Sequence, residues 1–382
     1  MTKFKTTLLA MAVSAAAFSV QAAQVSLYGS VSTGVLYQNQ ASLSGGEEPQ
    51  ESKDSFTMES GFWGDSIWGI TGEEDLGNGW TVGFTLENEF GSDTGEMAGA
   101  DPEGSVLFDS QAYLRIGNDK VNFAFGNIGG LASAGGDFDL LCAFDPMEAF
   151  VGVAGLGAFA SKDFASGNMA VVEVTPMEGF KVSLMGNTGD DDSNAKWSDR
   201  DHYYGLGVSY ENGPLALAAI AEMRKYDKVA ERNNLSDNDD SWTFTVAAAY
   251  DFDVIRPSFV YQHASKTREF AASEVSSGGA YNFDSFMLGA TAPLGQGTLR
   301  ASVQYVKGEN DAVSDEEGSA TILGLAYTYD MSKRTTLYGA AFYSVGGDGL
   351  DKDLGTNERA FGLMDRAEYN SVGFGVGLVH TF

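Results

Sequence analysis

The chain has 382 residues and a formal net charge of −30, because 53 acidic residues face 23 Lys and Arg. This acidity excludes a nucleic-acid-binding protein, which needs basic patches to neutralise phosphates. The single cysteine, Cys142, excludes a disulfide framework. A mean hydropathy of −0.14, with 48 Gly and only 7 Pro, is typical of paired strands in which apolar and polar residues alternate, because Pro cannot donate to a β-ladder.

The N-terminus predicts export. Lys3 and Lys5 precede an apolar stretch from Leu8 to Val20, and Val20–Ala22 supplies small residues for cleavage. This pattern predicts a cleaved signal peptide over residues 1–22, followed by one domain over residues 23–382. No apolar run reaches the roughly 20 residues that a membrane-spanning helix needs. A chain inserted in a membrane would therefore have to be a closed β-barrel.

Long polar connections alternate with tight turns along the chain. The long connections are residues 38–59, 91–109, 128–167, 186–201, 224–241, 265–281, 307–319 and 345–369, and the short turns are residues 72–79, 117–120, 175–179, 211–214, 251–253, 293–297 and 330–334. These connections predict an all-β fold, a 16-stranded antiparallel transmembrane barrel with long extracellular loops and short periplasmic turns. Such a barrel leaves an aqueous channel along its axis.

The segments between these connections alternate with a period of two. In the last one, Val372, Phe374, Val376, Leu378, His380 and Phe382 share one face, and small or polar residues share the other. Period two predicts strands whose two faces meet different surroundings. Phe382, an aromatic residue at the end of this strand, is expected to help close the barrel on its first strand. The alternative fold, a secreted β-sandwich or β-solenoid, does not require alternating long and short connections.

Several segments resemble the general-diffusion porins of Gram-negative bacteria, specifically the trimeric outer-membrane type common in β-proteobacteria. The strongest match is Ser66–Gly79, a strand followed by an acidic turn. The other matching segments are Gln24–Gly29, Leu107–Tyr113, Ser332–Tyr338 and Gly377–Phe382. The resemblance implies a homotrimer in the outer membrane, with a water-filled pore in each protomer and a third loop folded into the lumen.

The resemblance also implies a constriction where acidic residues of the third loop face basic residues of the wall. The loop is residues 128–167, and its acidic candidates are Asp137, Asp139, Asp145 and Glu148. The basic candidates, inward by alternation, are Arg115, Lys181, Arg256 and Arg300. The chain departs from the family where relatives carry Arg in Phe-x-Arg-Gln-Ala and Gly-Arg-Gln motifs, because Ser110 and Asn127 stand at those positions.

These patterns predict a passive channel for small hydrophilic solutes and ions that prefers cations, since carboxylates at a constriction select cations. The alternative is a substrate-specific channel, or an adhesin or other ligand-binding protein on a barrel scaffold. We expect outer-membrane lipid and lipopolysaccharide as partners, bridged to the acidic loops by divalent cations. No cofactor, metal site or enzyme activity is expected, because His202, His263 and His380 lie far apart and outside any catalytic or ligand motif.

Overall fold

A computed structural model describes most of the barrel. It covers residues 24–40, 53–61, 63–97, 100–101, 104–133, 135–147, 159, 166–189, 197, 200–225, 240–267, 281–310, 317–346 and 372–382. The expected signal peptide, residues 1–22, lies outside these ranges. Within the ranges, no helix combines the length and apolar character needed to cross a membrane.

The regular elements described below are strands, together with the short 3₁₀ helix η2. The strands are β1 (Gln24–Gln40), β2 (Lys53–Ser60), β3 (Ile67–Gly77), β4 (Trp80–Glu89), β5 (Ala100–Asp101), β6 (Gly104–Ser105), β7 (Gln111–Gly117), β8 (Val121–Ile128), β9 (Ser166–Met177), β10 (Phe180–Asn187), β11 (His202–Asn212), β12 (Leu215–Lys225), β13 (Ser241–Tyr250), β14 (Arg256–Thr267), β15 (Tyr281–Leu294), β16 (Gly297–Asn310), β17 (Glu317–Ser332), β18 (Thr335–Gly346) and β19 (Val372–Thr381). The helix η2 spans Cys142–Phe144.

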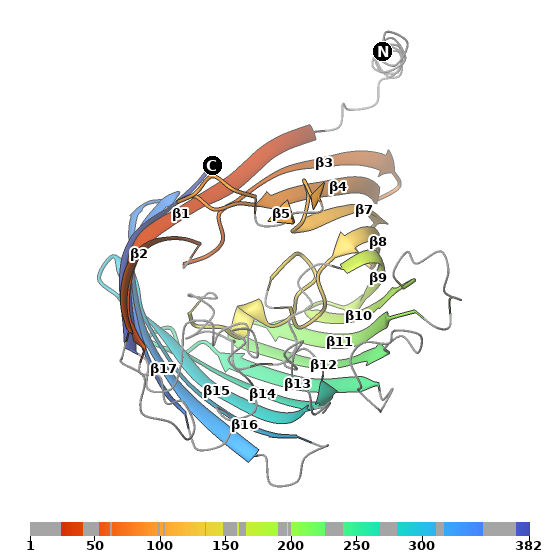
Figure 1. The fold of residues 1–382 in the computed structure, drawn as a ribbon. Coiled ribbons are helices and arrows are strands. Elements are labelled where there is room, and N and C mark those ends of the chain that lie inside the picture. Colours follow the sequence, from red (N-terminus) through yellow and green to blue (C-terminus); the bar gives the residue numbers. More distant parts are fainter. Residues whose placement is uncertain are drawn as a thin grey trace.

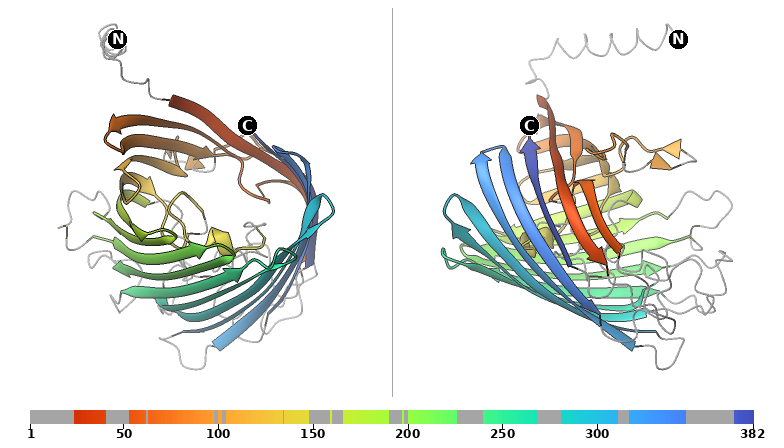
Figure 2. Two further views of the ribbon diagram at one scale, coloured as in Figure 1. Left: turned by 180° about the vertical axis from the view of Figure 1, so that it is seen from behind. Right: turned by 60° about the vertical axis from the view of Figure 1, so that its left-hand side comes forward.

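The strands close into a barrel (Figure 1). All except β5 and β6 belong to one sheet of 17 segments. β2 and β3 both pair with β1, along Thr33–Gln40 and Gln24–Ser30 respectively, so they share one place in the wall. β1 also pairs with β19 in antiparallel register, which closes the ring (Figure 2). The result confirms the predicted 16-stranded antiparallel barrel.

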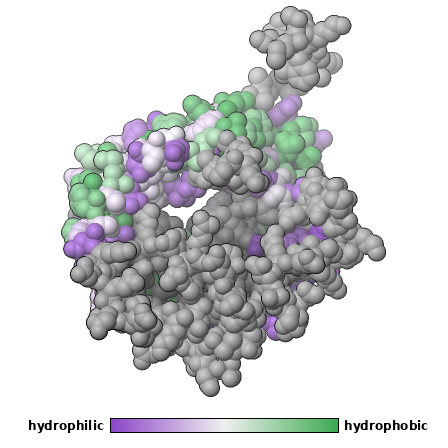
Figure 3. Space-filling view, in the orientation of Figure 1, coloured by the Kyte–Doolittle hydropathy of each residue, from purple (hydrophilic) through white to green (hydrophobic). Residues whose placement is uncertain are grey.

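The two faces of the wall differ as the sequence predicts. On β19, the side chains of Val372, Phe374, Val376 and Leu378 are exposed on the outside. The alternate positions, Gly373 and Gly377, lie on the inward face. The rings of Phe342 and Tyr338 on β18 cover these two glycines. Figure 3 shows hydrophobic residues on the outer surface and hydrophilic residues beside the opening of the barrel. This separation is what a wall between lipid and water requires.

Several strands extend further than their polarity indicates. The predicted turn at residues 72–79 shrinks to Asn78–Gly79, because β3 continues to Gly77. β16 continues to Asn310 and β17 begins at Glu317, so these strands take up both ends of the predicted loop at residues 307–319. Backbone pairing does not require apolar side chains. Polar residues therefore mark where the apolar, lipid-facing band on the outside of the barrel ends, and the strand itself can continue beyond that point.

The second wall strand is broken, which the sequence analysis did not predict. Between β2 and β3, Gly61 and Gly64 adopt positive φ angles of 66° and 72°, a conformation that favours glycine. Gly61 donates its N–H to the Ser32 carbonyl of β1 at 3.0 Å. Trp63, in this break, is 3% exposed. We call residues 61 and 63–66 the β2–β3 turn.

Phe382 lies beside β1, at the seam where β1 pairs with β19. Its N–H donates to the Gly29 carbonyl at 3.0 Å, and its carbonyl accepts from the Gly29 N–H at 3.4 Å. Its ring lies directly over Gly29. A side chain at position 29 would place its Cβ only 2.6 Å from the Phe382 Cζ, so the ring needs a glycine there. An aromatic ring over a glycine in the neighbouring strand helps to fix register. The seam therefore joins β1 and the last residue through both backbone and side chain.

We expect Phe382→Ala to weaken barrel assembly. Cross-strand aromatic contacts contribute roughly 0.2–1 kcal/mol, so the free energy of unfolding should fall by about that amount. Urea unfolding of the protein refolded in lipid vesicles measures it, and Phe382→Leu should lose less because it keeps an apolar contact. Equal stability of wild type and Phe382→Ala would contradict this role for the ring.

Candidate functional site: a pore constriction

The described part of the third loop lies inside the barrel. Leu131 donates its N–H to the Tyr203 hydroxyl of β11 at 3.1 Å, and Ala132 donates its N–H to Glu222 of β12 at 3.2 Å. Further along, the Pro146 carbonyl accepts from Arg300 of β16 at 3.1 Å. The loop leaves the wall at β8 and contacts inward-facing residues of strands far around the ring. The inward-folded third loop is therefore confirmed for these residues.

Small residues in the wall make room for this loop. A Cβ on Gly207 of β11 would lie 2.5 Å from the Leu140 Cδ1, and one on Gly289 of β15 would lie 2.5 Å from the Pro146 Cγ. The inward positions of β12 to β18 are also mostly small or apolar, namely Ala216, Ala218, Ile220, Ala247, Ala249, Val260, Ala264, Met287, Ile322, Ala326 and Ala340. Leu131, Leu141, Phe144 and Met147 of the loop are buried with them. Apolar packing thus holds the loop on this side of the barrel.

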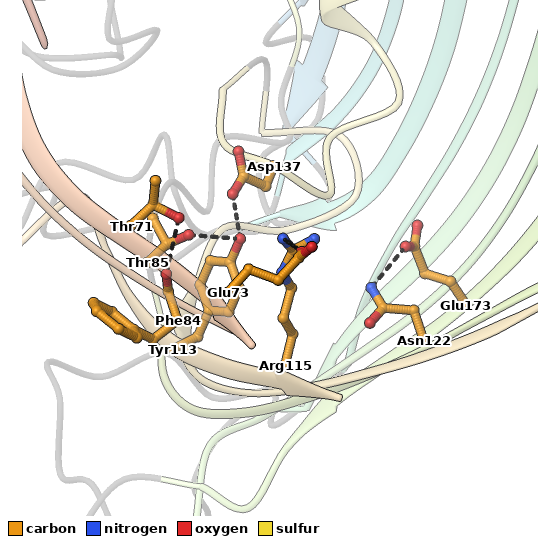
Figure 4. A network of polar contacts seen from close by, with 9 residues as sticks. All are labelled: Thr71, Glu73, Phe84, Thr85, Tyr113, Arg115, Asn122, Asp137 and Glu173. Carbon is orange, nitrogen blue, oxygen red and sulfur yellow. Dashed lines mark hydrogen bonds and ion pairs between the residues drawn. The ribbon is translucent and has the colours of Figure 1, made fainter. Parts of the chain in front are cut away.

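The predicted acidic residues of the loop have different surroundings. Asp137 accepts a hydrogen bond from the Tyr113 hydroxyl of β7 (Figure 4), and its N–H donates to the Gln111 side chain at 3.0 Å. Asp139 accepts from the N–H groups of Leu141 and Cys142 at 2.9 and 2.6 Å. Asp145 accepts from the Met147 N–H at 2.8 Å. Glu148 lies outside the described residues.

The predicted basic residues face inward and have different partners. Arg115 forms a 2.6 Å ion pair with Glu73 of β3 (Figure 4), and Lys181 forms one of 3.1 Å with Glu173 of β9. Arg256 is the first residue of β14, next to a periplasmic turn. Among the four, Arg300 is the residue that bonds the third loop, through the Pro146 carbonyl.

A carboxylate that the sequence analysis did not select lies on the wall near Asp137. Glu87 of β4 is 6% exposed and accepts hydrogen bonds from Tyr28 at 2.8 Å, Ser110 at 2.6 Å and Gln111 at 3.3 Å. These donors are all neutral. Gln111 also accepts from the Asp137 N–H, so one side chain joins both carboxylates. The sequence does hold a signal for this residue, because the alternation of β4 places the charged Glu87 on the inward face.

Ser110 and Asn127, the two positions where the family resemblance implies Arg, are not equivalent. Ser110 bonds the inward-facing Glu87. Asn127 pairs with Ala112 on the outward side of the ladder, and its amide donates to the Phe108 and Asp109 carbonyls at 3.4 and 3.2 Å. The expectation that both positions belong to the lumen wall is thus wrong for Asn127. Asn127 lies two residues after the outward-facing Phe125, so the alternation of β8 itself places it on the outer face.

Cys142 places an exposed thiol on the third loop. The thiol is open to the lumen yet surrounded by atoms of the protein, so partial desolvation, followed by the negative charge of Asp139, raises its pKa. The thiol therefore stays protonated at neutral pH. It is the only cysteine of the chain, which makes it a specific chemical handle in the lumen.

The chain matches the family model described as Gram-negative porin over residues 6–348. It belongs to this family. It is 28% identical over 395 residues to outer membrane porin protein 32 of Delftia acidovorans, covering 99% of this chain and 100% of that protein. It is 26% identical over 419 residues to an outer membrane porin protein of Bordetella pertussis, with the same coverage.

Among solved structures, the anion-selective porin from Comamonas acidovorans has the same fold, with a TM-score of 0.69, 22% identity and coverage of 94% of this chain and 100% of that one. The chain is therefore an outer-membrane porin of a Gram-negative bacterium, and the family consists of channels.

Modification of Cys142 with a bulky anionic methanethiosulfonate should reduce single-channel conductance, because the added group enters the lumen. The reaction should accelerate as the pH rises, since the thiolate is the reactive form. Planar-bilayer recording measures the effect, and Cys142→Ser should be insensitive. Unchanged conductance after complete modification, verified by mass spectrometry, would show that the loop does not border the conducting path.

Proposed function

We propose that this porin is a passive channel for small hydrophilic solutes and ions that prefers cations. The observation that carries the proposal is the contrast between its charged groups. Glu87 and Asp137 are held by neutral donors, whereas Arg115 is paired with a carboxylate. Lys181 is likewise paired with Glu173.

The strength of the attraction between one wall carboxylate and a passing cation supports the proposed cation preference. At an effective dielectric constant of about 20, a monovalent cation about 8 Å from one uncompensated carboxylate gains about 2 kcal/mol. Salt screens exposed charges over about 8 Å at physiological ionic strength. The acidic loops at the mouth are therefore screened more strongly than carboxylates on the wall. The formal charge of −30 adds a long-range attraction for cations.

The anion-selective porin from Comamonas acidovorans shares 22% of its residues with this chain. At that identity the likeness supports the barrel, whereas selectivity depends on individual charged side chains. Ser110, which bonds Glu87, stands where relatives carry a wall Arg. The local charge balance thus supports a cation preference here.

The proposed assembly is a homotrimer in outer-membrane lipid. One structural neighbour, OmpT of Vibrio cholerae, is described as a trimer form, with 16% identity and a TM-score of 0.62. We also propose that divalent cations bridge the acidic loops to lipopolysaccharide. A substrate-specific channel or ligand-binding barrel is the second candidate, and conductance that saturates with a single solute would favour it over passive diffusion.

Ser110→Arg should shift the reversal potential across a salt gradient toward anions, because the new guanidinium would lie beside Glu87. Asn127→Arg is the matched control, since Asn127 faces outward and should change the potential little. Bilayer recording with a KCl gradient measures both variants. Equal shifts in the two variants, or an anion-selective wild type, would count against the proposal.

Glu87→Gln should lower the cation-to-anion permeability ratio, because it removes a charge and keeps the shape of the side chain. A decrease of about two-fold or more is expected from one wall carboxylate. Glu74→Gln serves as the control, since Glu74 pairs with Val82 on the outer face. If both variants kept the wild-type ratio, selectivity would have to arise elsewhere in the channel.

A further inference from the structure

The β2–β3 turn is held firmly inside the barrel. Ser32 of β1 donates its hydroxyl to the Trp63 carbonyl at 3.0 Å and its N–H to the Ser66 hydroxyl at 3.0 Å. On the other side, Phe90 donates its N–H to the Ser66 carbonyl at 2.9 Å. Contacts on both sides fix the position of the turn. It is a built element of the wall rather than a simple interruption of a strand.

Trp63 extends from this turn into the lumen. Its ring stacks on that of inward-facing Tyr338 in β18, with centroids 5.7 Å apart and an interplanar angle of 24°. β18 is separated from β2 by β1 and β19. Neighbouring strands are about 4.8 Å apart, so the indole must leave the wall to make this contact. Its position therefore narrows the lumen on the side of β16 to β19.

Arg300 joins Trp63 to the third loop. Its Cζ lies 5.3 Å from the centroid of the Trp63 ring, which is within the range of a cation–π contact. The same guanidinium donates to the Pro146 carbonyl at 3.1 Å. One side chain of β16 thus contacts two elements that come from different parts of the chain. The turn, Arg300 and the loop form a continuous set of contacts through the lumen.

We propose that Trp63 sets the size limit of this channel, as a constriction in addition to the third loop. Arg300 is its positioning residue, because it holds the indole and the loop in a fixed relation. An indole is large and rigid, and its ring is pinned between Tyr338 and Arg300. With 3% of its surface exposed, the indole fills space on this side of the lumen, and it cannot swing back against β2 without losing both contacts.

This proposal rests on the channel activity of the family and not on the proposed cation preference. The two are distinguished by their readouts. Trp63 carries no charge, so its replacement should change conductance and the largest permeant solute and leave the reversal potential unchanged. If the reversal potential showed no preference for cations, the proposed size limit at Trp63 would be unaffected.

The test is a series at position 63 in the assembled protein. Trp63→Ala should raise single-channel conductance by about 1.5-fold or more, since conductance depends on the open cross-section, and should admit larger sugars in liposome swelling. Trp63→Phe should give a smaller rise. Trp68→Ala is the matched control, because Trp68 pairs with Gly29 on the outer face of β3 and should leave both quantities unchanged.

Arg300→Gln tests the positioning role. It should raise conductance and current noise by freeing the indole and the loop, and it should add little in a Trp63→Ala background. The proposal is overturned if Trp63→Ala assembles normally and keeps the wild-type conductance and size limit. If Trp63→Ala does not assemble, wild-type values for Trp63→Phe overturn it equally.

Discussion

Closure of the sheet is the constraint on which the rest of this molecule depends. Backbone groups in a bilayer must be paired within the protein, and a sheet achieves this when it has no free edge. Here β1 pairs with β19 on one side and with β2 and β3 on the other. Once the ring is closed, each strand has one face in lipid and one in the lumen. The period-two pattern of the sequence follows from that requirement.

Closure also leaves a space that the chain must partly fill. Small residues on the inner face of β11 to β15 accept the apolar side chains of the third loop, as at Gly207 and Gly289. Apolar burial therefore holds the loop on that side. Asp139 and Asp145 bond backbone N–H groups within the loop, and the carboxylates near the opposite wall meet neutral donors.

Much of the fold could be predicted from the sequence because it depends on local pattern. Alternation assigned inward faces to Arg115, Lys181, Arg256 and Arg300, and the register agrees. The pairing of Arg115 with Glu73 could not be predicted, since it depends on the registers of β3, β4 and β7 together. Asn127 was misplaced because its position was inferred from the family resemblance, whereas the alternation of β8 puts it on the outer face. The β2–β3 turn was missed because a strand broken by two glycines has the composition of a loop.

The number of basic residues on the wall is consequently a poor guide to selectivity in this barrel. A charge acts on a passing ion according to what already compensates it, and nearby opposite charge weakens its field in the lumen. The Arg115 and Lys181 ion pairs each present nearly balanced charge to the solution. Arg300 is turned toward a carbonyl and an indole. Glu87 accepts hydrogen bonds from the neutral donors Tyr28, Ser110 and Gln111, so these contacts do not offset its negative charge, and the proposed cation preference rests on this difference from the paired basic residues.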